Sequence, residues 1–386
     1  MSDLQDFSVT PQLTTIPLSG GRISLKVFTA LKPLEHLCAF AARKNAKRGF
    51  LIVSKVLGRH LPTRPSVMEA AAEALAEQVI AQAEHLPGPI LFVGLAETAV
   101  CLGHSVHDRF GALTGRDDTL FIHTTRQHLD AEVIATFSEP HSHAAKHLIY
   151  APELAWHREL LRTARSLILV DDEVSTGVTL VNLAHALSPH LPDLKRICTA
   201  TLADWSNSGD YAGRMPAPAV HASLLEGAIS WLADEQIDPV ISPMVPVDAL
   251  GTLETHVNYG RLGAQGRPPV VPALLQALPR RTSDRFLVLG TGEFTWPPFL
   301  LAQALEQEGH DVVMQATSRS PIRLGGAIEC ALTFRDNYAT GVPNYLYNVR
   351  PEAGRRVILC HETPVGSIDP DLVQALDAEC LHFGTE

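Results

Sequence analysis

The sequence lacks the features that would place the chain in a membrane, outside the cell or on nucleic acid. It has no run of about 18 apolar residues, so we expect no membrane-spanning helix. Its first residues lack the basic and apolar regions of a signal peptide. The six cysteines show no paired spacing, which indicates free thiols in a reducing cytoplasm. A net charge of −11 argues against a nucleic-acid partner, because binding to nucleic acid needs a dominant basic surface.

The length and composition of the sequence indicate a globular protein of more than one domain. With 386 residues, 46% of them hydrophobic, the chain is longer than one ordinary domain needs. Between residues 238 and 283 repeated prolines break any long element. We therefore expect a first domain over residues 1–237, a proline-rich connection over 238–283 and a second domain over 284–386.

One stretch combines a strand, two carboxylates, a small turn and a helix start. Residues 166–170 read as a buried parallel strand, and Asp171 and Asp172 follow where we expect this strand to end. The turn 175–179 is rich in hydroxyls, and an apolar run over 180–187 predicts a helix. Ligands of open α/β sheets bind at the carboxyl ends of strands, and a helix N-terminus favours an anion. An ordinary turn with an acidic helix cap is the alternative.

Val-Asp-Asp-Glu-Val-Ser-Thr-Gly-Val-Thr at 170–179 resembles the phosphoribosyl pyrophosphate (PRPP) motif of type I phosphoribosyltransferases. The resemblance implies that Asp171 and Asp172 hold the ribose hydroxyls and, largely through PRPP, a Mg²⁺ ion. It implies that the 5-phosphate binds to the turn Ser175, Thr176, Gly177, Val178 and Thr179. Two positions depart from the family pattern. Glu173 replaces an aliphatic residue and is a candidate local base, and Ser175 replaces the acid that purine-specific members carry.

A second strand, loop and helix precede this motif. Residues 90–93 read as a buried strand, and a loop leads from it into a helix. In the resembling family the loop at this place binds pyrophosphate. The resulting pyrophosphate candidates are Gly94, Ala96, Glu97, Thr98 and, after the strand 119–123, Arg126.

A histidine-rich stretch follows the expected strand 133–137. His141, His143 and His147 lack the spacing of a common zinc site. The resemblance implies a mobile loop that closes over PRPP, in which His141, His143 and Lys146 neutralise the leaving pyrophosphate. A metal site and a plain surface turn are the two alternatives.

The last part of the chain reads as a small βαβ unit. It has strands over 285–289 and 311–316, with a helix over 297–308 between them. Gly290-Thr291-Gly292 is too short for a dinucleotide fingerprint. The turn after the second strand carries Ser318, Arg319 and Ser320, and a guanidinium suits a carboxylate or phosphate. We expect these three residues to bind the acceptor.

Together the two halves resemble phosphoribosyltransferases with a C-terminal TRSP domain, which are associated with tellurium-resistance and stress-response gene clusters. The resemblance implies an α/β fold, namely a type I phosphoribosyltransferase core with a mostly parallel sheet flanked by helices and a smaller Rossmann-like domain. It implies a Mg²⁺-dependent enzyme that transfers phosphoribose from PRPP to a nitrogenous acceptor, releases pyrophosphate and serves the synthesis of a nucleoside-like metabolite. A homodimer is one expected assembly. A PRPP-sensing regulator without catalysis is the alternative function.

Overall fold

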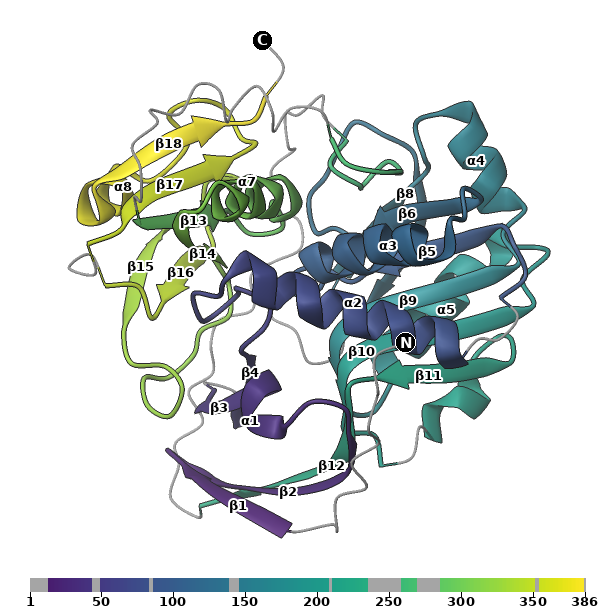
Figure 1. Ribbon diagram of the computed structural model, residues 1–386, viewed down its shortest axis with the longest axis horizontal. Helices are drawn as coiled ribbons and strands as arrows, with labels where there is room; N and C mark the ends of the chain where they lie inside the picture. The colour runs from purple at the N-terminus through teal and green to yellow at the C-terminus, as the bar shows by residue number, and fades with distance from the viewer. Residues whose placement is uncertain are drawn as a thin grey trace.

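The computed structural model describes residues 13–43, 49–82, 86–138, 146–207, 210–234, 258–268, 285–350 and 354–384. Two α/β units lie side by side, and the sheet of the first unit extends into twisted strands at the bottom of the view (Figure 1). None of the helices in these ranges has the length and hydrophobicity needed to cross a bilayer.

The first unit is built on a mixed sheet with a parallel centre. Its strands follow the order β1-β2-β12-β10-β9-β5-β6, and β11 also pairs with β10. Neighbours among β11, β10, β9, β5 and β6 are parallel, whereas β1, β2 and β12 pair antiparallel. The bounds are β1 Leu13–Leu18, β2 Gly21–Ala30, β5 Ile90–Gly94, β6 Thr119–His123, β9 Ser166–Val174, β10 Arg196–Asp204, β11 Ala219–Ser223 and β12 Leu225–Ala233.

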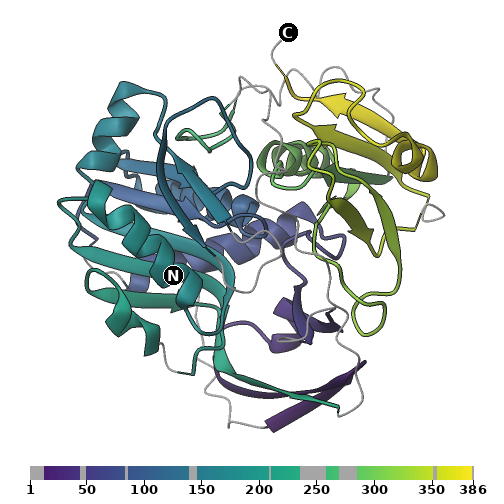
Figure 2. The same ribbon diagram turned by 180° about the vertical axis from the view of Figure 1, so that it is seen from behind.

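Helices cover both faces of this sheet, which explains the unbroken apolar run of its central strand. In β9, Ile168 and Val170 join a core under α2 and α3, while Leu167 and Leu169 join a core under α4 and α5. These helices are α2 Pro65–Gln82, α3 Val100–Thr114, α4 Ala155–Arg162 and α5 Val178–Leu187. Figure 2 shows the second of these layers from behind.

Short elements complete the described chain. They are the helix α1 Leu34–Leu37, the 3₁₀ turns η1 Ser188–His190 and η2 Asp210–Arg214, and three antiparallel hairpins. The hairpins pair β3 Cys38–Ala42 with β4 Phe50–Ser54, β7 Val133–Ser138 with β8 Lys146–Tyr150, and β15 Ala331–Arg335 with β16 Pro343–Tyr347. The strand expected at 133–137 is confirmed, and its partner β8 was not expected.

The second unit is a parallel sheet in the order β14-β13-β17-β18. Its strands are β13 Arg285–Gly290, β14 Asp311–Ala316, β17 Arg356–His361 and β18 Ala378–His382, and its helices are α7 Trp296–Gln307 and α8 Pro370–Leu376. The β13-α7-β14 unit confirms the βαβ pattern expected from the sequence. The α/β fold class, with a mostly parallel sheet and a smaller second α/β unit, is confirmed as well.

The two units share an interface along α7, which packs against α2 and α3 (Figure 1). Met68 and Cys101 join the core of the second unit, and Trp296 stacks on His104 with ring centroids 4.9 Å apart. The spacing of Ser66 and Glu69 is typical of a helix-capping box, but Ser66 lies inside α2, which begins at Pro65. The backbone N–H and the Oγ of Ser66 donate to the Glu306 carboxylate at 2.7 and 2.9 Å.

Candidate active site

The adjacent carboxylates lie inside the central strand rather than after it. We expected the strand to end at residue 170, but β9 continues to Val174, because Asp171 and Glu173 pair with residues of β10. Side chains alternate along a strand, so Asp171 and Glu173 share one face and Asp172 lies on the other. All three are partly exposed, and the Asp172 N–H donates to Asp171 Oδ1 at 2.9 Å.

Cys38 of β3 faces these acids. Burial, with a further contribution from the charges of Glu173 and Asp172, raises the pKa of the Cys38 thiol to about 12. The thiol therefore stays protonated at neutral pH. A neutral thiol of β3 thus lies near the acidic end of β9.

The proposed phosphate turn has the backbone that the sequence suggested. Gly177 has φ +68 and precedes α5, so the first amide groups of that helix follow the turn. A Cβ at this position would approach Tyr211 Cγ to 2.2 Å. The Arg214 side chain donates to the Thr176 carbonyl at 2.6 Å. Arg214 lies outside the motif, and sequence reasoning missed it.

The candidate pyrophosphate loop lies directly beside the acidic strand. Gly94 of β5 pairs with Val170, one residue before Asp171. The Ala96 N–H donates to Thr124 Oγ1 at 2.9 Å, and the peptide bond between Ala96 and Glu97 is cis. The backbone N–H of Ala96 is therefore already used inside the protein, while Thr98 is partly exposed.

Arg126 follows β6, whereas Lys146 is the first residue of β8. Arg126 is buried, its backbone N–H donates to Glu293 Oε1 at 2.8 Å, and its guanidinium lies 3.4 Å from His147 Nε2. His147 Nδ1 in turn lies 3.0 Å from Thr124 Oγ1. Lys146 is exposed at the start of β8. His141 and His143, expected on the same mobile loop, lie outside the described residues.

Arg59 connects the candidate pyrophosphate loop to the second unit. Its side chain is 3% exposed, and its Nη1 lies 3.1 Å from Glu97 Oε1. The same nitrogen donates to the carbonyls of Gly292 and Thr317 at 2.8 and 2.6 Å, and Nη2 donates to the Glu97 carbonyl. Gly292 follows β13 and Thr317 follows β14. The loops at the carboxyl ends of strands in both units therefore meet at one guanidinium.

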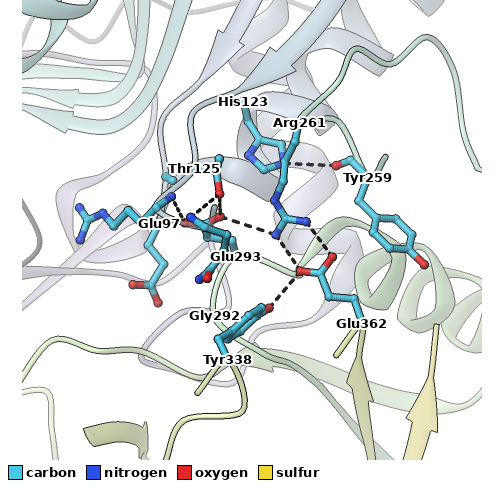
Figure 3. A network of polar contacts seen from close by, with 12 residues as sticks. Glu97, His123, Thr125, Tyr259, Arg261, Gly292, Glu293, Tyr338 and Glu362 are labelled. Atoms are coloured by element: carbon cyan, nitrogen blue, oxygen red, sulfur yellow. Dashed lines mark hydrogen bonds and ion pairs between the residues drawn. The ribbon is translucent and has the colours of Figure 1, made fainter. Parts of the chain in front are cut away.

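A second buried network joins the units through the turn that contains Arg261 (Figure 3). Arg261 donates to both oxygens of Glu362 at 2.7 Å and lies 3.6 Å from Glu293 Oε2. Tyr338 also donates to Glu362, at 3.0 Å. Residues 259–262 form a turn inside the stretch expected to be a proline-rich connection, and the local sequence did not indicate the ion pairs of Arg261.

Glu293 is the centre of the contact with the first unit. It accepts hydrogen bonds from Thr125 Oγ1 and from the Arg126 N–H. Burial alone would raise the pKa of Glu293, but Arg261, aided by other positive groups and by Thr125, holds it below the usual value. Burial lowers the pKa of His123 to about 4, so this neighbouring imidazole is neutral. The network therefore consists of charged Arg and Glu side chains beside neutral histidines.

The structure brings Ser318, Arg319 and Ser320 to the same interface. Ser318 pairs through its backbone with Tyr345, and the Ser320 carbonyl accepts a hydrogen bond from Tyr347 Oη at 2.6 Å. Arg319 is 9% exposed, and its positive charge contributes to the lowered pKa of Glu293. The carbonyl of Thr317, directly before this turn, accepts from Arg59, which binds Glu97, so the turn begins beside the candidate pyrophosphate loop, although sequence reasoning assigned its residues to the acceptor.

The acidic strand end suits a magnesium ion held mainly through a substrate. Asp171 and Asp172 are partly exposed carboxylates, and Mg²⁺ prefers oxygen ligands and retains several waters. Within the described ranges, no group of three or more His, Cys, Asp and Glu side chains is arranged to hold a metal. Two carboxylates and the oxygens of a diphosphate would complete such a site without a third acid.

The fold and this site define an α/β protein with acidic side chains and a glycine turn before a helix at the carboxyl edge of a parallel sheet. Comparison with protein families is more specific. Residues 37–228 match the family described as phosphoribosyl transferase, and residues 262–376 match the TRSP domain that lies C-terminal to that family. The chain thus contains a phosphoribosyl transferase domain followed by a TRSP domain.

Several solved structures are weakly similar to this chain. Adenine phosphoribosyltransferase from Rhodothermus marinus is 14% identical, with a TM-score of 0.34 over 50% of this chain and 96% of its own. The Saccharomyces cerevisiae enzyme is 12% identical, with a TM-score of 0.33 over 49% and 95%. TM-scores below 0.5 do not establish a common fold, so the family matches carry the assignment. No curated protein matches the chain.

Proposed function

We propose that the protein is a phosphoribosyltransferase that moves phosphoribose from PRPP to a nitrogenous acceptor and releases pyrophosphate. The supporting observation is the position of Asp171 and Asp172 between the candidate pyrophosphate loop and the candidate phosphate turn. The loop 94–98 lies beside them through the pairing of Gly94 with Val170, and the glycine turn before α5 follows them along the chain. The family match over residues 37–228 points to the same chemistry.

Each group of residues would have a separate role in binding and catalysis. Asp171 and Asp172 accept hydrogen bonds from the ribose hydroxyls, and the turn 175–179 donates backbone N–H groups to the 5-phosphate. Loop 94–98 and Arg126 hold the leaving pyrophosphate. Departure of pyrophosphate leaves positive charge on the ribose ring, which nearby carboxylates stabilise. Glu173 shares a face with Asp171 and is the candidate base for the acceptor proton.

The acceptor side depends on the second domain. Ser318, Arg319 and Ser320 remain the proposed acceptor residues, because Arg319 offers a fork of donors to an anionic group. Mg²⁺, when bound, would neutralise part of the diphosphate charge. A role in nucleoside-like metabolite synthesis, the tellurium-resistance association, a cytoplasmic location and a homodimer are proposed from the resemblance alone.

The test is pyrophosphate release from PRPP in the presence of Mg²⁺ and a pool of nitrogenous bases. Asp172→Asn should retain the fold but lower turnover about tenfold to a hundredfold, because a charge-assisted hydrogen bond contributes roughly 1.5–3 kcal/mol. Asp193→Asn is the matched control, since Asp193 is exposed before β10, at the opposite edge of the sheet. Equal turnover in both variants would remove Asp172 from the site. PRPP binding without pyrophosphate release would instead identify a regulator.

A further inference from the structure

The interface between the two domains buries polar side chains that have no partner among the described residues. Arg319 is 9% exposed and its Nη1 has no hydrogen bond. Gln127 is 1% exposed, and neither its amide nitrogen nor its amide oxygen has a partner. Thr291 is 2% exposed, and its hydroxyl is likewise unpaired. Three such groups in one region call for an occupant, because buried polar groups nearly always form hydrogen bonds.

All three groups are connected to Glu293. The Gln127 N–H donates to Thr125 Oγ1 at 3.0 Å, and that hydroxyl donates to Glu293. Thr291 precedes Glu293 by two residues in the turn after β13. The charge of Arg319 contributes to the lowered pKa of Glu293, which places the guanidinium near the carboxylate. The unpaired groups therefore come from both domains, and each belongs to a residue that is linked to Glu293 by its position in the chain, through a hydrogen bond or through its charge.

The charges around Arg59 and Glu293 favour a negative ligand. The guanidinium groups described in this part of the interface belong to Arg59, Arg126, Arg261 and Arg319, and the carboxylates belong to Glu97, Glu293 and Glu362. Four positive and three negative charges leave one positive charge when the histidines are neutral. Glu362 is already held by both terminal nitrogens of Arg261, whereas Nη1 of Arg319 has no hydrogen-bond partner among the described residues.

The unpaired atoms are mainly donors. A guanidinium nitrogen, an amide nitrogen and a hydroxyl can all donate to oxygen, and a guanidinium matches the geometry of phosphate and carboxylate. We propose that Arg319, Gln127 and Thr291 form an oxyanion site between the domains, which binds a phosphate or carboxylate group. The proposal rests on the proposed function only for the source of the oxyanion, which is the diphosphate of PRPP or an acidic group on the acceptor.

Two apolar variants, Arg319→Met and Gln127→Leu, test the site. Gln127→Leu removes only unpaired side-chain groups, so it should leave the ligand-free protein equally stable or more stable in urea denaturation. The same variants should bind inorganic pyrophosphate about tenfold to a hundredfold more weakly by calorimetry, because charged and neutral hydrogen bonds to the oxyanion are lost. Arg335→Met is the matched control, because the Arg335 side chain is 81% exposed in the same domain. This control should not change pyrophosphate affinity.

The source of the oxyanion follows from a second titration. Nicotinate carries a carboxylate where nicotinamide carries an amide. A difference between the two in affinity, or in acceptance of phosphoribose, therefore measures recognition of an acidic group on the acceptor. Weaker pyrophosphate binding in Arg319→Met assigns the site to the diphosphate. Unchanged pyrophosphate binding with a lost preference for nicotinate assigns it to the acceptor. If wild-type protein shows neither property, or if Arg319→Met alters neither, the site does not exist.

The transferase activity and the oxyanion site can be disproved independently of each other. A protein that binds pyrophosphate through Arg319 but releases none from PRPP would retain the oxyanion site and lose the transferase assignment. A protein that transfers phosphoribose equally well in wild-type and Arg319→Met forms, with equal affinities, would retain the transferase and lose the site.

Discussion

Replacing Arg59 by Met should disturb both the contact between the domains and the binding of PRPP. Arg59 follows β4 in the first domain, yet its guanidinium binds the Glu97 carboxylate and carbonyl and the carbonyls of Gly292 and Thr317. Methionine retains most of the side-chain length and removes every donor. Loop 94–98 then loses its attachment to the two turns of the second domain.

The size of the effect follows from burial. The Arg59 and Glu97 side chains are 3% and 12% exposed, and removing one partner of a buried ion pair costs about 3–5 kcal/mol. Arg64 provides the comparison within the same loop, because it pairs with Asp311 of the second domain at 3.3 Å but is 57% exposed. An exposed pair contributes about 0–1 kcal/mol. Arg59→Met should therefore be destabilised several times more than Arg64→Met.

Urea denaturation measures the free energy of unfolding, and calorimetry measures PRPP affinity. Arg59→Met should bind PRPP at least about tenfold more weakly, because an ordering cost of about 1.4 kcal/mol for the loop reduces affinity by that factor. Adding Glu97→Gln to Arg59→Met should restore part of the stability, since it removes the uncompensated carboxylate. If Arg59→Met and Arg64→Met are equal in stability and in PRPP affinity, Arg59 does not couple the loop to the second domain.

Two further predictions concern the phosphate turn and the pH dependence of stability. Gly177→Ala should cost about 1–3 kcal/mol of stability and weaken PRPP binding, because its φ of +68 disfavours a side chain and a Cβ would meet Tyr211. Gly213→Ala, whose Cβ would meet nothing within 4 Å, is the control, and equal results for both would contradict the strain argument. Burial lowers the pKa of His107 to about 4, so between pH 6.5 and 4 the unfolded chain binds a proton that the folded chain does not. The free energy of unfolding should fall as pH decreases through this window, and His107→Gln should reduce that slope by up to about 1.4 kcal/mol per pH unit, which urea denaturation at several pH values can measure.

Sequence reasoning succeeded where the signal lies within one continuous segment. The apolar run 166–170, the acids at 171 and 172 and the glycine turn before α5 are consecutive, so their types and order predict strand, carboxylates and helix start. The β13-α7-β14 unit was predictable for the same reason. The extension of β9 to Val174 was not, because acidic residues disfavour a strand by composition and only pairing with β10 keeps them in it.

The interface could not be predicted, because its partners are far apart in the chain. Arg261 and Glu362 are separated by 101 residues, and Arg59 and Thr317 by 258. An isolated arginine in a loop resembles any solvated surface charge, and only the fold shows that Arg59 and Arg261 are buried against specific acceptors. Arg319 was singled out through its turn, but Gln127 carries no sequence signal for a site.

These contacts make the second domain part of the same structural unit as the candidate active site. Without it, Arg261 would lose Glu362 and Glu293, and Arg59 would lose two of its carbonyl acceptors. Met68 and Cys101 would also lose the apolar core that covers them. The contacts converge on the loops that hold the candidate pyrophosphate residues rather than on a distant surface. These contacts favour the proposal that the second domain acts on departure of the leaving group as well as on choice of the acceptor. A role limited to stabilising the first domain would not account for the buried donors left unpaired at Arg319, Gln127 and Thr291.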